Sequence, residues 1–111
     1  MSAAPLRDLE LTVLLAVVEL LPEAYAAAVG RLLAERTGRA YSVGAVHTTL
    51  SRLEGKGLLT SALSAPLPVR GGRARREFQL TTAGWAAARA GVAERERAMR
   101  LAPALGREAD G

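Results

Sequence analysis

The chain has 111 residues, of which half are hydrophobic, and its 15 basic and 11 acidic residues give a net charge of +4. This length predicts a single folding unit with a small core. The absence of cysteine excludes disulfides, zinc fingers and thiol chemistry, and the pI near 10.6 favours a polyanionic partner.

Two helices are predicted in the first 40 residues. Asp8 can cap the first of them, residues 8–21, where apolar residues recur at helical spacing until Pro22. The second helix covers residues 23–37 and ends at Gly38, a natural helix-ending residue. Its apolar stripe comprises Tyr25, Ala28, Val29, Leu32 and Leu33.

No membrane span and no signal peptide are expected. The longest apolar run, residues 11–21, contains Glu19 and is too short to cross a bilayer. Charged residues precede this run, which is unlike a signal peptide. The expected location is therefore the cytoplasm.

A third helix is predicted from the N-cap Ser42 to about residue 56, with Gly57 at its end. Four apolar residues at helical spacing are expected to face inward. They are Val43, Val46, Leu50 and Leu53. The opposite face is small and polar. It comprises Gly44, Thr48, Ser51 and Arg52, flanked by Ala45 and His47.

A hairpin is predicted after this helix. Residues 58–65 read as its first strand and residues 75–80 as its second, because Pro66 and Pro68 remove backbone donors and Gly71-Gly72 marks a turn. Four arginines lie in or beside the connecting loop. They are Arg70, Arg73, Arg75 and Arg76.

A last helix follows, capped by Thr81 or Thr82 and ended by Pro103. Apolar residues near heptad spacing predict that it packs in the core or against a second copy of the chain. These residues are Trp85, Ala88, Val92 and Met99. The fold class expected is mainly α with a small β-hairpin, an α+β arrangement. Residues 1–80 would form a winged helix-turn-helix domain, and residues 81–111 a dimerisation helix with a frayed tail.

The basic excess lies on the third helix and the hairpin. Residues 41–80 carry six basic and two acidic residues, whereas residues 1–40 carry four and five and residues 81–111 five and four. A helix with a small polar face beside a basic hairpin suits the DNA major groove and its phosphates. Each feature alone is also typical of a solvated surface helix or of a loop that keeps a hairpin soluble.

No catalytic or metal-binding constellation is visible. His47 is the only histidine, and no cysteine or carboxylate cluster accompanies it at ligand spacing. It also lacks a nucleophile partner, and no phosphate-cradling glycine loop follows a strand. We expect neither an enzyme nor a bound metal or cofactor.

Residues 42–58 resemble the recognition helix of PadR-family bacterial transcriptional regulators. The matching residues are Gly44, Leu50, Arg52, Leu53, Glu54, Gly57 and Leu58. The segments Gly71-Gly72-Arg73, Arg76-Glu77-Phe78 and Leu80-Thr81 with Gly84 are similar to the family's wing and last helix. His47 replaces the family's usual tyrosine. The resemblance covers about residues 9–90 and implies a winged-helix repressor that forms a homodimer through its C-terminal helices.

The sequence thus predicts a dimeric, sequence-specific DNA-binding regulator that acts as a repressor on double-stranded DNA. The residues expected to meet DNA are Ser42, Gly44, His47, Thr48, Ser51, Arg52, Arg70, Arg73, Arg75 and Arg76. The alternative is a winged-helix module that binds another protein and not DNA. Whether a small-molecule effector exists, and which site it would use, stays open.

Overall fold

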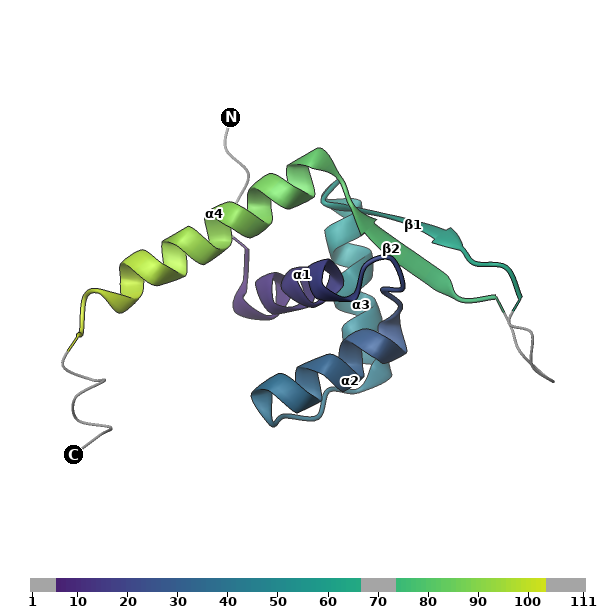
Figure 1. The fold of residues 1–111 in the computed structure, drawn as a ribbon, viewed down its shortest axis with the longest axis horizontal. Helices are drawn as coiled ribbons and strands as arrows, with labels where there is room; N and C mark the ends of the chain where they lie inside the picture. Colours follow the sequence, from purple (N-terminus) through teal and green to yellow (C-terminus); the bar gives the residue numbers. More distant parts are fainter. Residues whose placement is uncertain (1–5, 67–73, 104–111) are drawn as a thin grey trace.

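Three helices and a β-hairpin surround one apolar core, and a fourth helix runs out from it on the side away from the hairpin (Figure 1). The computed structural model describes residues 6–66 and 74–103. The helices are α1 (Asp8–Leu20), α2 (Ala26–Thr37), α3 (Val43–Gly55) and α4 (Thr82–Met99). The strands are β1 (Leu59–Leu63) and β2 (Arg76–Leu80). The predicted order of elements and the α+β class are confirmed, and the tail at 104–111 lies outside the described residues.

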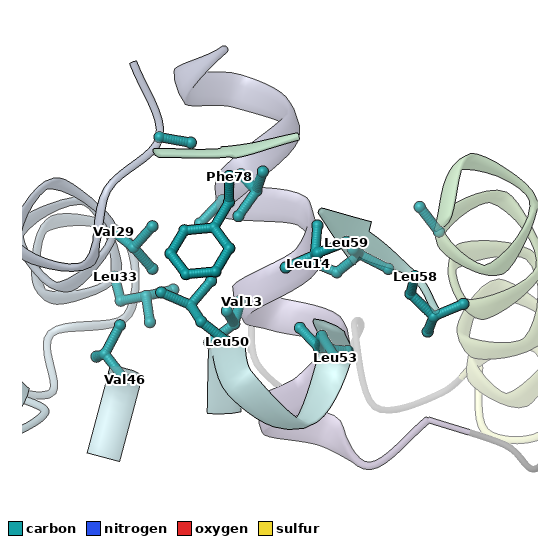
Figure 2. Close-up of a cluster of buried hydrophobic side chains, with 14 residues drawn as sticks. Val13, Leu14, Val29, Leu33, Val46, Leu50, Leu53, Leu58, Leu59 and Phe78 are labelled. Carbon is teal, nitrogen blue, oxygen red and sulfur yellow. The ribbon is translucent and has the colours of Figure 1, made fainter. Parts of the chain in front are cut away.

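The core forms where α1, α2, α3 and the base of the hairpin meet. Leu14 of α1 and Leu50 of α3 are fully buried, and Phe78 of β2 is the largest of the fully buried side chains described. Figure 2 shows the Phe78 ring beside Val29 and Leu33 of α2. The strands pair antiparallel with Phe78 opposite Ser61. Burying an aromatic ring from β2 among three helices fixes the hairpin to the helical body.

The start of α2 differs from the sequence prediction. The helix begins at Ala26 and not at residue 23, because Tyr25 has extended backbone angles of φ −124° and ψ 161°. The Phe78 N–H donates a 2.8 Å hydrogen bond to the Ala24 carbonyl oxygen. Residues 24–25 therefore run beside β2 as a short extended segment, and Tyr25 lies outside the helical stripe in which it was expected.

The start of α1 also differs. Asp8 is the first helical residue and not the N-cap, which is Arg7. The Glu10 carboxylate accepts the Arg7 backbone N–H at 3.0 Å and the Lys56 Nζ at 2.7 Å. Burial alone would raise the pKa of Glu10, but the hydrogen bonds from Lys56 and Arg7 and their positive charges hold its pKa below the ordinary value of 4.5. This ion pair ties the start of α1 to the end of α3.

Helix α4 docks on the hairpin base through a close backbone approach. Thr81 caps the helix as predicted, with its hydroxyl accepting the Gly84 N–H at 2.9 Å. A Cβ at Gly84 would lie 2.0 Å from the Leu58 carbonyl oxygen. A Cβ at Gly91, about two turns further along the same side of α4, would lie 2.7 Å from a Leu11 methyl carbon. Two glycines thus let α4 lie against Leu58 and α1.

Replacing Gly84 by alanine is expected to destabilise the protein by about 1–3 kcal/mol or more, because the obstructing atom is backbone and cannot rotate away. Urea unfolding of the Gly84→Ala variant measures this loss. Gly55→Ala is the matched control, since a Cβ there would meet no other described part of the chain within 4 Å. Equal stability of the two variants would contradict the close approach.

Replacing Lys56 by methionine is expected to lower the free energy of unfolding by about 1 kcal/mol at neutral pH, because Glu10 is buried and loses its charged partner. The folded pKa of Glu10 is depressed, so the contribution is present above its unfolded pKa and is lost as pH falls through the folded value. The wild-type advantage over Lys56→Met should therefore shrink in acid. Arg36→Met, which removes an exposed ion pair with Glu19, should cost less at neutral pH.

Candidate nucleic-acid interface

Helix α3 has one buried side and one exposed side. The Ser42 hydroxyl accepts the Ala45 N–H at 3.0 Å, which confirms the predicted N-cap. Leu50 and Leu53 are buried as expected, as is Val46. Val43 was expected to face inward but is 64% exposed, because it lies in the first turn before α3 enters the core. Thr49, which was not expected to face inward, is buried, and its hydroxyl donates to the Ala45 carbonyl oxygen at 2.9 Å.

The residues expected to meet DNA from α3 share its exposed side. They are Gly44, His47, Thr48, Ser51 and Arg52. A Cβ at Gly44 would meet no heavy atom of the described residues within 4 Å, apart from its chain neighbours and its own helix backbone. Within the described ranges Arg52 has no acidic side chain within ion-pair distance. This side of α3 therefore offers hydroxyls, an imidazole and a guanidinium to an outside partner.

A chain of three polar side chains links α3 to both strands of the hairpin. The Ser61 hydroxyl on β1 donates to Glu54 Oε2 on α3 at 2.7 Å. Arg76 Nη1 on β2 donates to the same Ser61 oxygen at 2.9 Å. Arg76 is exposed, whereas Ser61 and Glu54 are half-buried. The Glu54–Ser61–Arg76 chain therefore holds an arginine of the hairpin beside α3.

The hairpin lies along one edge of the exposed side of α3. Glu54 follows His47 by seven residues, so the two side chains leave the helix within roughly 20° of each other. Arg76, held at Glu54 through Ser61, consequently lies on the His47 edge of that side. Arg52 leaves α3 at the other edge. The exposed side of α3 is thus bordered by a guanidinium at each edge.

Arg75 is placed differently from Arg76, although both were expected to hold phosphates. Its guanidinium carbon lies 3.9 Å from the centroid of the Tyr25 ring, and its Nη2 lies 3.4 Å from Glu77 Oε2. The Tyr25 hydroxyl also accepts Arg31 Nη2 at 3.0 Å. Arg75 therefore ties the hairpin to the segment before α2, and its stacked face is covered by protein.

Two of the expected DNA contacts, Arg70 and Arg73, lie outside the described residues, as do the glycines between them. Among the residues that are described, no cluster of acidic, histidine or cysteine side chains can hold a metal ion. None of the described helices is long and apolar enough to cross a membrane.

The four residues expected to form a dimer interface differ in how exposed they are. Trp85 is 38% exposed and Met99 74% exposed, and Val92 is half-buried. Ala88 is only 5% exposed and packs in the chain's own core, which is one of the two placements expected for these residues. A groove of about 370 Å³ runs between α1 and α4. It is lined by Leu15, Val18, Trp85, Ala88, Arg89, Val92, Ala93 and Glu96.

Sequence reasoning did not predict the contacts that Tyr25, Glu54 and Ser61 make in this region. One signal was available for Ser61, because strand alternation puts it on the same side as Leu59, which is buried. A serine at an inward-facing position often has a polar partner. The partner itself depends on how the hairpin sits on α3, which local patterns do not specify.

Several solved structures share this fold. A PadR-like transcriptional regulator from Bacillus cereus has a TM-score of 0.71 and 18% identity, over 87% of this chain and 89% of that chain. A PadR family regulator from Eggerthella lenta has a TM-score of 0.64 and 26% identity, over 89% and 85%. One from Clostridium difficile has a TM-score of 0.61 and 20% identity, over 91% and 98%.

No family model matches the chain, and the comparison with curated proteins finds no match. The identities to the solved structures are low, but the agreement extends over most of each chain. The resemblance first seen in residues 42–58 and in the hairpin is thereby extended to the fold. The chain has the winged-helix fold of PadR-like transcriptional regulators.

Proposed function

We propose that this protein is a sequence-specific, DNA-binding transcriptional regulator that works in the cytoplasm as a homodimeric repressor. The observation that carries the proposal is the exposed polar side of α3 bordered by Arg52 and Arg76. A major groove admits one helix, and phosphates flank it on both sides. A polar helix face with a guanidinium at each edge would bring polar side chains to the base edges and positive charge to the flanking phosphates.

In the bound state α3 would lie in the major groove. Thr48, Ser51 and His47 would approach base edges, and Arg52 would reach a guanine or a phosphate. Ser42 would keep its role as N-cap at the end of α3 nearest Gly44. Arg76 would hold a phosphate on the hairpin side, and Arg70 and Arg73 are proposed to do so as well, since guanidinium groups bind phosphate bidentately.

Arg75 takes a lesser part in this proposal. Because its guanidinium is stacked on Tyr25 and lies near Glu77, its phosphate contact would have to compete with those interactions. We therefore assign it chiefly to holding the hairpin against the segment before α2. Four arginines that look equivalent in the sequence would then have two different tasks.

The dimer would form through the apolar groove between α1 and α4, with Trp85, Val92 and Met99 at the contact. Arg89 and Glu96 both line the groove and lie seven residues apart on α4, so Arg89 of one copy could pair with Glu96 of the other across a two-fold axis. A two-fold dimer would present two copies of α3 to successive major grooves, roughly 34 Å apart, on a near-palindromic site. Repression would follow from blocking polymerase at such a site.

Binding to duplex DNA tests the first part of this proposal. A duplex taken from just upstream of the protein's own gene should bind, and log K should fall with log salt at a slope of about −0.9 for each phosphate contacted. A protein-binding module, the alternative function, would show no affinity for any duplex. Absence of binding even at low salt would therefore contradict DNA recognition.

Replacing Gly44 by leucine is expected to weaken duplex binding by at least about tenfold, or about 1.4 kcal/mol, because the new side chain would enter the groove with α3. The fold should be unaffected, since the position opens to free space within the described chain. A gel-shift titration measures the loss. Ala90→Leu, on an exposed part of α4, is the control that should bind like the wild type.

Replacing Val92 by glutamate is expected to weaken dimerisation by roughly 100-fold, because an unpaired charge would be buried in an apolar contact. Sedimentation equilibrium measures the association. Ala90→Glu adds the same charge to the same helix outside the groove and should leave the dimer intact. A Val92→Glu protein that associates as tightly as Ala90→Glu would rule out this interface.

A further inference from the structure

We propose that Ser61 is a positioning residue, which together with Glu54 directs the guanidinium of Arg76 toward a phosphate beside α3. This proposal rests on the DNA-binding function argued above. It concerns the Glu54–Ser61–Arg76 chain, whose hydrogen bonds of 2.7 Å and 2.9 Å join α3, β1 and β2.

The Ser61 hydroxyl is held in one orientation because it donates one hydrogen bond and accepts another. Its one hydrogen goes to the Glu54 carboxylate, and its oxygen accepts from Arg76 Nη1. A hydroxyl has a single donor and rotates to suit its partners. Once Glu54 takes that donor, the lone pairs of Ser61 point toward Arg76, and the direction of the guanidinium follows.

Packing alone does not explain a serine at this position. Ser61 lies opposite Phe78 and two residues after Leu59, and both neighbours are buried. An apolar β-branched residue would bury more surface on this side of the strand. The serine hydroxyl instead forms hydrogen bonds with Glu54 and Arg76, which indicates that these contacts are the reason for a serine here.

The intervening serine keeps Arg76 available. A direct ion pair with Glu54 would engage the planar fork of the guanidinium, and the described residues contain no such pair. Only Nη1 is used by Ser61, so the other edge of the exposed guanidinium is free of described partners. Arg75 differs on both counts, since it stacks on Tyr25 and pairs with Glu77.

A double-mutant cycle on duplex binding tests the proposal. Ser61→Ala should weaken binding by about three- to tenfold in the wild-type protein and have no further effect in an Arg76→Ala background. Arg76→Ala should also reduce the salt slope by about one contact. Thr60→Ala, at an exposed neighbouring position on β1, is the matched control and should bind normally. Ser61→Thr keeps the hydroxyl and should restore affinity.

A second variant keeps the proposal testable if Ser61→Ala is poorly folded. Glu54→Ala leaves Ser61 and Arg76 in place but frees the hydroxyl, so it should also weaken binding only when Arg76 is present. An equal loss from Ser61→Ala with and without Arg76, or no loss at all, would overturn the positioning role while leaving DNA recognition intact. Failure of the wild type to bind any duplex would overturn both.

Discussion

The position of the hairpin depends on Phe78. Its ring fills the space between the helices, and its backbone N–H bonds to the Ala24 carbonyl oxygen at 2.8 Å. The first contact fixes the depth of β2 in the core, and the second fixes its edge against the segment before α2. Because a strand shows alternate side chains on opposite sides, fixing Phe78 also fixes where Arg75 and Arg76 point. The surface beside α3 is therefore a consequence of how the core is filled.

Alternation of side chains then gives two neighbouring arginines unlike surroundings. Arg76 shares the side of β2 that carries Phe78, and where the strand leaves the core this side turns toward α3 and Ser61. Arg75 projects the other way and reaches Tyr25, which is free to receive it because that residue is extended and not helical. In the sequence the two arginines carry the same charge and cannot be told apart by it. Of the two, only Arg76 keeps a guanidinium edge free of described partners next to α3.

Local patterns predicted most of the fold and part of the candidate site. Helical spacing and hydroxyl caps located α3 and α4, because a cap such as Ser42 or Thr81 acts within three residues of itself. The exposed side of α3 was also predicted, since helical periodicity alone separates it from Leu50. The role of Tyr25 was not, because a hydrogen bond from β2, more than fifty residues away, decides where α2 begins. Ser61 and its partners depend in the same way on hairpin register.

Two helical glycines, Gly84 and Gly44, differ in whether the packing of the chain itself explains the absence of a side chain. Gly84 has an internal reason, since a Cβ there would collide with the backbone of Leu58. Gly44 has none within the described chain, yet glycine is less favourable than alanine in a helix. The cost at Gly44 is accounted for if something outside the chain must come close to the first turn of α3. A helix that enters a groove has that requirement, whereas a helix face that meets only water does not.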